Sequence, residues 1–221
     1  MSRPRLLVLA GGGKEPTEGG TGFKNLKLKE RIVGADIVAV ASHHARGGVS
    51  AKARELGVPF THFPSPYTAE RYQGLVRHTR ADIVACLGWV KPVRGLNPAT
   101  TINTHNGLPP FIGRGMFGTH THEATMAAYA RGEVTEAGFF MHFVTDFDAD
   151  GDYDRGPEFF RLVFPIRSMS TPDSHGWLTR SFERLWQPEI TNLIVTRQIR
   201  WSGRRGDPVL CPRWYRPVQR G

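Results

Sequence analysis

The segment 101-TINTHNGLPPFIGRGMFG-118 decides how the rest of the chain is interpreted. It begins as a strand-like run that ends with an amide, Asn103, and an imidazole, His105, and it continues into a loop rich in proline and glycine. A carboxylate follows later, in 154-DRGP-157. An amide can hold a carbonyl oxygen on which negative charge develops, and an imidazole with a carboxylate can manage protons. We therefore expect Asn103, His105 and Asp154 to be the catalytic residues of an acyl transfer to an amine.

The bulk composition fits one globular domain. The chain has 221 residues, of which 39% are hydrophobic and 10% aromatic, so it is long enough to bury a core. No run approaches the ~20 apolar residues of a membrane span, and the N-terminus lacks the apolar core of a signal peptide. Cys86 and Cys211 lie far apart without metal-ligand spacing. We predict a cytoplasmic protein without a metal site or a disulfide framework.

The net charge of +9 points to anionic partners. Such partners are small phosphorylated or carboxylated molecules, or a nucleic acid. The end of the chain, residues 197–220, is rich in arginine, and a solvated basic tail explains it as well as a binding surface does. We predict small-molecule substrates rather than a nucleic acid or a membrane, with a homodimer as one candidate assembly.

Short apolar runs alternate with helical patterns through the first half of the chain. This alternation predicts a single-domain, Rossmann-like α/β fold, in which helices flank a mostly parallel twisted sheet, followed by a mixed C-terminal part. Ligands of such sheets bind outside the carboxyl ends of the strands. Three segments fall at such ends and should converge on one crevice: 11–25, 88–93 and 103–105. The predicted strands are 6–10, 37–41, 58–60, 82–87, 139–144 and 159–166, and the predicted helices are 23–29, 50–56, 67–78, 123–129 and 174–198.

The glycine-rich segment 11–25 follows the first predicted strand and precedes a helix. That arrangement leaves backbone N–H groups pointing at an anion, and Lys14, Lys24 and Asn25 would add side-chain donors. The segment matches neither a Walker motif nor the regular dinucleotide spacing. A flexible surface loop is an equally good interpretation.

An acidic loop, residues 146–154, carries five alternating aspartates. It resembles a calcium loop for a few residues, but the glutamate expected at position 12 of such a loop is missing: counted from Asp146 or Asp148, that position is Pro157 or Phe159. Asp148, Asp150 and Asp152 are alternatives to Asp154 as the catalytic carboxylate. His120 and His122, on a predicted helix, are expected to shape the crevice rather than to carry protons.

Taken together and in order, these motifs resemble those of the folate-dependent formyltransferases, most closely the members that act on glycinamide ribonucleotide in purine synthesis. The resemblance runs from Leu6 to about Gln198 and includes 102-INTH-105, 113-GRGMFG-118, 142-HFV-144 and 154-DRGP-157. It implies transfer of a formyl group from 10-formyltetrahydrofolate to the amine of glycinamide ribonucleotide, without a metal. It also implies a single formyltransferase domain over 1–221, with a phosphate-binding half (about 1–100), a catalytic and folate-binding half (about 101–198) and a basic tail (about 199–221).

The resemblance also implies roles for individual residues. Asn103 and His105 would stabilise the oxyanion, and Asp154 would help His105 to hold its charged form. Gln187 takes the place of the glutamate that contacts the acceptor ribose. The implied phosphate-binding residues are Gly20, Thr21, Gly22, Phe23, Lys24 and Asn25. The implied folate-binding residues are Trp89, Val90, Lys91, Pro92, Val93, Val144, Thr145 and Asp146; a buried core position is an equally good interpretation of Trp89.

Several departures from the family pattern concern the acceptor. The glycine loop is longer than usual and carries Phe23-Lys24 where a small hydroxyl residue is common. Asn106-Gly107 replaces a common Pro-Ser, a change also seen in formyltransferases that act on amino sugars. Alternative functions are therefore formylation of another amine, such as an amino sugar nucleotide, and hydrolysis of formyltetrahydrofolate. A nucleic-acid-binding protein that uses residues 197–220 is an alternative from a different class.

Overall fold

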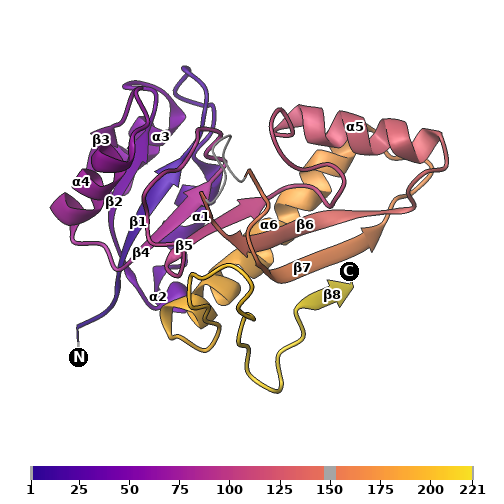
Figure 1. Ribbon diagram of the computed structural model, residues 1–221. Coiled ribbons are helices and arrows are strands. Elements are labelled where there is room, and N and C mark those ends of the chain that lie inside the picture. Colours follow the sequence, from indigo (N-terminus) through magenta and orange to yellow (C-terminus); the bar gives the residue numbers. More distant parts are fainter. Residues whose placement is uncertain (1, 147–152, 221) are drawn as a thin grey trace.

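The computed structural model describes residues 2–146 and 153–220. Its strands form one sheet in the order β3-β2-β1-β4-β5-β6-β7-β8 (Figure 1). The strands are β1 (Arg5–Ala10), β2 (Asp36–Ser42), β3 (Phe60–His62), β4 (Ile83–Leu87), β5 (Thr101–His105), β6 (Glu136–Phe143), β7 (Glu158–Pro165) and β8 (Val218–Arg220). The helices are α1 (Thr21–Leu28), α2 (Glu30–Val33), α3 (Gly48–Glu55), α4 (Ala69–Thr79), α5 (Thr119–Ala130) and α6 (Pro172–Val195).

The sheet is parallel from β3 to β5 and mixed beyond it. Strands β1 to β5 pair in parallel, β6 runs antiparallel to both β5 and β7, and β8 pairs in parallel with β7. The predicted α/β fold with a mixed C-terminal part is therefore confirmed. The sequence pattern did not predict the short elements α2 and β8.

Both faces of the central strands are buried, which explains their unbroken apolar runs. Leu6 and Val8 of β1 pack into one core cluster, whereas the alternate residues Leu7 and Leu9 pack into the other. Helices α1, α2, α3 and α6 contribute to the first cluster, and α4 contributes Tyr72 to the second. In a strand that is buried on both faces, successive side chains are all apolar, as is common in parallel sheets.

Helix α6 is the longest helix and spans 24 residues. It begins with a capping box, in which the Thr171 and Ser174 side chains each accept a hydrogen bond from the other residue's backbone N–H. The helix runs through Pro188 as one element, although a proline inside a helix lacks the N–H for one helical hydrogen bond. The helix therefore spans both halves of the sheet and contacts α1 and α2 as well as α5.

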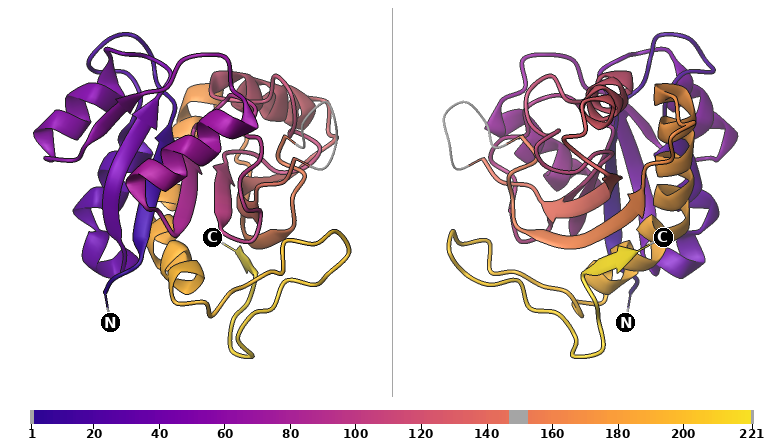
Figure 2. Two further views of the ribbon diagram at one scale, coloured as in Figure 1. Left: turned by 60° about the vertical axis from the view of Figure 1, so that its left-hand side comes forward. Right: turned by 90° about the vertical axis from the view of Figure 1, so that its right-hand side faces the viewer.

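The arginine-rich end is folded onto the sheet. Figure 2 shows the segment after α6 (yellow) as an extended loop that leaves the body and returns to the sheet edge at β8. Ile199, Trp201 and Tyr215 are buried, and the Tyr215 hydroxyl donates a hydrogen bond to the Phe159 carbonyl at 2.7 Å. The interpretation as a simple solvated tail therefore does not hold for these residues, although the arginines of this segment are exposed.

Neither a membrane helix nor a metal cluster is present in the part of the chain that the structure describes. No helix there has the length and apolar character needed to cross a membrane. Across residues 2–146 and 153–220, no three His, Cys, Asp or Glu side chains gather in a way that could hold a metal ion.

Candidate active site

Three polar side chains meet where β5 and β6 pair. Asn103 and His105 are two residues apart on β5, so their side chains lie on the same face of the sheet. The antiparallel register places His142 of β6 directly opposite Asn103. Asp154 reaches the same point from the segment between β6 and β7. The structure thus brings together the three residues that the sequence analysis selected, and it adds His142.

The Asp154 carboxylate is the centre of this cluster. Its Oδ1 accepts a hydrogen bond from Asn103 Nδ2 at 2.9 Å and lies 3.4 Å from His142 Nε2. Its Oδ2 lies 3.1 Å from His105 Nδ1 and accepts a longer hydrogen bond, 3.4 Å, from the Gly113 backbone N–H. Asp154 adopts a left-handed conformation with φ 57°, which costs a non-glycine residue on the order of 1 kcal/mol. The contacts of its carboxylate offset this strain.

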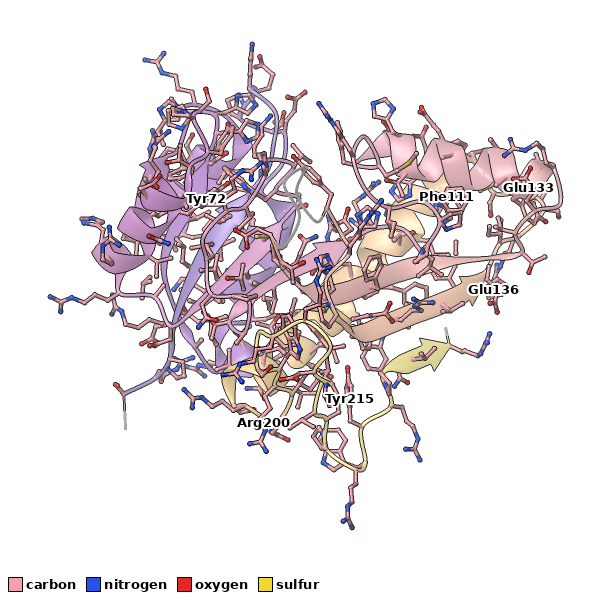
Figure 3. All side chains as sticks on the ribbon, viewed as in Figure 1. Tyr72, Phe111, Glu133, Glu136, Arg200 and Tyr215 are labelled. Atoms are coloured by element: carbon pink, nitrogen blue, oxygen red, sulfur yellow. The ribbon has the colours of Figure 1, made fainter. Side chains whose placement is uncertain are left out.

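His105 is positioned to carry a positive charge. Its Nδ1 faces the Asp154 carboxylate, and its Nε2 lies 2.9 Å from the carbonyl oxygen of Phe111, which belongs to the loop between β5 and α5 (Figure 3). Both partners are acceptors, so both ring nitrogens carry a proton. Burial alone would lower the pKa of His105, but the Asp154 carboxylate and the Phe111 carbonyl raise it above the ordinary value.

The same contacts hold Asp154 in its charged form. Burial would raise the pKa of this carboxyl group, but His105 and His142 outweigh burial and hold the pKa far below the ordinary value. Asp154 and His105 therefore form a buried ion pair, with side chains 12% and 7% exposed. A carboxylate with such a low pKa is a weak base.

His142 was part of a recognised motif but was not predicted as a site residue. Its Nδ1 lies 2.9 Å from the carbonyl of Phe143, and its Nε2 lies 3.1 Å from Asn103 Nδ2. With Nδ1 donating to Phe143, Nε2 accepts from Asn103 when it carries no proton and donates to Asp154 Oδ1, 3.4 Å away, when it does. Only the register of β5 against β6 shows this contact, and the spacing of the motifs along the chain does not.

Two cavities meet at this cluster. The first is lined by the segment after β4, by Val144 and Thr145, and by His142. The second is lined by the loop 113–118 and by residues 103–106. Four residues line both cavities: Trp89, Asn103, Tyr153 and Asp154. Two polar side chains of the cluster, Asn103 and Asp154, thus face both spaces.

Most of the predicted folate-binding residues line the first cavity. These are Trp89, Lys91, Pro92, Val93, Val144 and Thr145, whereas Val90 lines the second cavity. The Asp146 carboxylate instead accepts a hydrogen bond from the Gly95 backbone at 2.6 Å. Asp148, Asp150 and Asp152, the alternatives to Asp154, lie outside the described residues.

Tyr72 of α4 fixes the wall of the first cavity (Figure 3). Its hydroxyl accepts a hydrogen bond from the indole N–H of Trp89 at 3.0 Å and donates one to the carbonyl of Pro92 at 2.7 Å. Trp89 is only 7% exposed and packs in the core cluster of Tyr72, yet it also lines both cavities. Both interpretations of this tryptophan, core residue and cavity wall, therefore fit the structure.

The glycine loop lies at the same edge of the sheet, but two of its three predicted side-chain donors, Lys24 and Asn25, are engaged elsewhere. Lys24 pairs with Glu55 of α3 at 2.5 Å, and the Asn25 amide donates to the carbonyl of Arg184 on α6 at 3.0 Å. The Phe23 side chain is fully buried. The first turn of α1, which begins at Thr21, still offers backbone N–H groups without intrahelical partners.

The prediction for Gln187 does not fit the structure. Its side chain is 1% exposed and lines neither cavity, and its oxygen has no partner among the described residues. Glu183, one turn earlier on α6, accepts a hydrogen bond from Asn106 and lies 3.7 Å from the position that a β-carbon on Gly22 would occupy. Burial raises the pKa of Glu183. The sequence analysis missed this carboxylate, although it lies on the same helix face as Gln187.

The two histidines of α5 lie in different environments. His120 is exposed, and its Nδ1 lies 3.5 Å from Oε2 of Glu123. His122 is buried, and its Nδ1 lies 3.1 Å from Nδ1 of His175 on α6. Burial lowers the pKa of His122 to about 4, with a further contribution from His175. His122 therefore packs α5 against α6 and lines neither of the two cavities.

Comparison with known proteins places these features in a family context. No family model matches the chain. The chain is 25% identical over 214 residues to the chloroplastic phosphoribosylglycinamide formyltransferase of Arabidopsis thaliana. The matched region covers 90% of this chain and 68% of the plant protein. The chain is also 25% identical over 228 residues to the Vigna unguiculata protein of the same name.

Solved structures show the same fold. Phosphoribosylglycinamide formyltransferase from Anaplasma phagocytophilum has a TM-score of 0.75 at 21% identity and covers 99% of both chains. Glycinamide ribonucleotide transformylase 1 from Symbiobacterium toebii has a TM-score of 0.75 at 24% identity, with 94% of both chains covered. A formyltetrahydrofolate deformylase from Burkholderia mallei has a TM-score of 0.73 at 21% identity. The match covers 96% of this chain and 71% of the deformylase. The predicted resemblance to the folate-dependent formyltransferases is confirmed.

Proposed function

We propose that this protein transfers the formyl group of 10-formyltetrahydrofolate to the amine of glycinamide ribonucleotide, a step of purine biosynthesis. The observation that carries this proposal is that Asn103 and Asp154 line two adjacent cavities. A group bound in one space can therefore be passed to a nucleophile in the other beside the same amide and carboxylate. The names of the similar plant and bacterial formyltransferases support the choice of the acceptor, and the name of the Burkholderia mallei deformylase supports formyltetrahydrofolate as the donor.

The first cavity suits the folate donor. A flat heteroaromatic ring needs apolar walls with a few polar groups that fix its orientation. Trp89, Val93 and Val144 supply the apolar surface, and Lys91 and Thr145 supply polar groups. The co-substrate brings the formyl group as an activated acyl group, and the protein supplies its position next to Asn103.

Asn103 is the proposed donor to the oxygen that gains charge when the amine attacks, and His105, whose two N–H groups face Asp154 and Phe111, is proposed to stabilise that oxygen by its positive charge. In this structure both N–H bonds of the Asn103 amide already point at acceptors, Asp154 and His142. The contact with Asp154 is made to a charged carboxylate, so it is the stronger of the two. We infer that the formyl oxygen takes the place of His142 as an acceptor, while the bond to Asp154 keeps the amide in position.

Asp154 acts by holding charge rather than by removing a proton. Its pKa lies far below the ordinary value, so it is a poor base for the attacking amine, but it keeps the neighbouring His105 positively charged. A buried imidazolium beside a developing oxyanion stabilises the transition state electrostatically. The proton that the amine loses balances the proton gained by the folate nitrogen that the formyl group leaves.

The second cavity is the proposed acceptor site. Glu183, like Gln187, lines neither cavity, but it contacts Asn106, which lines the second one. It therefore replaces Gln187 as the proposed contact to the acceptor ribose, because its carboxylate can accept hydrogen bonds from hydroxyl groups. Backbone N–H groups at the start of α1 remain the proposed contacts of the glycine loop to the phosphate, since the Lys24 and Asn25 side chains are engaged. A homodimer and a cytoplasmic location stay predictions.

Initial-rate kinetics test this function. The absorbance of the released folate is followed with 10-formyltetrahydrofolate alone and with glycinamide ribonucleotide added. The proposal requires release that depends on the acceptor. Equal release without an acceptor would instead indicate a hydrolase, the activity named for the Burkholderia mallei neighbour. Release with an amino sugar nucleotide but not with glycinamide ribonucleotide would favour the alternative that Asn106-Gly107 suggests.

A further inference from the structure

Apart from His105 of the catalytic cluster, the second cavity has one basic side chain among its described lining residues. That residue is Arg114, in the loop between β5 and α5. The one carboxylate in the same lining, Asp154, is already engaged by Asn103, His105, His142 and the Gly113 backbone. Arg114 therefore places a positive charge on the wall of this cavity, and the catalytic cluster does not pair with it.

Arg114 has no partner of its own. Its side chain is exposed, and in residues 2–146 and 153–220 it forms no hydrogen bond or ion pair. Lys24 of the glycine loop, by contrast, is paired with Glu55. An unpaired guanidinium on the wall of a cavity is suited to an anion, because its planar fork matches phosphate and carboxylate oxygens.

The backbone places Arg114 next to the reacting centre without making it part of that centre. The preceding residue, Gly113, donates its N–H to the Asp154 carboxylate at 3.4 Å. Gly113 and Gly115 have φ values of 94° and 89°, so glycines on both sides adopt a conformation that other residues rarely reach. Arg114 is thus held one residue away from a contact to Asp154, and its long side chain can extend along the cavity towards a more distant part of the acceptor.

We propose that Arg114 pairs with the phosphate of the acceptor and sets the preference for a phosphorylated amine. This inference rests on the proposed function and names a residue that determines its substrate class. The anion could also come from the glutamate carboxylates of the folate donor, which present the same chemistry to a guanidinium. The test therefore separates the two sources.

Direct binding tests the assignment without depending on turnover. Titration calorimetry compares ribose 5-phosphate with ribose as ligands of the wild type, Arg114→Ala, Arg114→Lys and Arg213→Ala. Arg213 is a matched control because it is exposed and unpaired but lies in the C-terminal segment. Loss of a charge-assisted contact should weaken ribose 5-phosphate binding by about 10- to 100-fold in Arg114→Ala. Arg114→Lys should recover part of the affinity, and Arg213→Ala should keep all of it.

Several results would overturn the proposal. Arg114→Ala could bind ribose 5-phosphate as tightly as the wild type, or the wild type could bind it no better than ribose. In steady-state kinetics, a rise in KM for 10-formyltetrahydrofolate with an unchanged KM for the acceptor would assign the guanidinium to the donor instead. Failure of the proposed function looks different: phosphate binding would still depend on Arg114, but glycinamide ribonucleotide would not be formylated.

Discussion

The Asp154→Asn substitution removes one negative charge from the centre of the candidate site and keeps the size of the side chain. The carboxylate accepts through both oxygens, from Asn103 on one side and from His105 on the other. An amide has only one oxygen, so its NH2 group must face a donor on one of these sides. His105 would relieve this conflict by losing the proton on Nδ1, and it would then be neutral.

The size of the effect follows from the geometry. At the 3.1 Å separation between His105 and Asp154, two charges attract by on the order of 5 kcal/mol at an effective dielectric constant of about 20. The cost of burying both charges offsets much of this, and hydrogen bonds to charged groups contribute about 1.5–3 kcal/mol net. Each 1.36 kcal/mol of barrier is about tenfold in rate. We therefore expect kcat to fall by about 100-fold.

Two assays check this prediction. Steady-state kinetics at saturating substrates measure kcat, and NMR titration of the histidine side chains follows the His105 imidazole. In the wild type His105 should titrate above the ordinary histidine pKa, and in the variant below it, because burial then acts unopposed. Asp36→Asn, on the surface beside Arg3, is the control and should change neither kcat nor the pKa of His105. An unchanged kcat, or a His105 that keeps its raised pKa in Asp154→Asn, would refute the reasoning.

Further substitutions test other parts of the site. Asn103→Ala should lower kcat by about two to three powers of ten, the usual loss for one oxyanion donor, and near-wild-type turnover would remove this amide from the mechanism. Tyr72→Phe should raise KM for the folate donor with little change in kcat, whereas Tyr215→Phe, which also loses a buried hydrogen bond to a backbone carbonyl, should leave that KM unchanged. Glu183→Ala should raise KM for the acceptor; Gln187→Ala should alter thermal stability only, and the reverse pattern would restore the sequence-based assignment.

The sequence was most informative where local pattern and position agree. Apolar runs such as Leu6–Ala10 identify strands that are buried on both faces, and residues at strand ends, such as Asn103 and His105, fall in the crevice that parallel topology creates. Contacts between distant segments were harder to predict. The pairing of Asn103 with His142 depends on strand register, and β8, a strand of three residues, forms by pairing with β7.

Errors arose where the direction of a side chain decides its role. Gln187 and Glu183 lie one helical turn apart on α6, and only the packing of the helix shows which of them reaches Asn106 and the glycine loop. Lys24 and Asn25 lie in the predicted loop, but their side chains turn towards α3 and α6. A sequence motif predicts the position of the backbone, whereas the residues packed around a side chain determine its direction.

The central claim is that one cluster passes a formyl group between two cavities to an amine. The most direct measurement uses 10-formyltetrahydrofolate labelled with ¹³C in the formyl group, with glycinamide ribonucleotide as acceptor and the product identified by mass spectrometry and NMR. The account predicts the label in a new amide on the glycinamide nitrogen, with formation slowed in Asp154→Asn. Label recovered as free formate, with the acceptor unchanged, would contradict it.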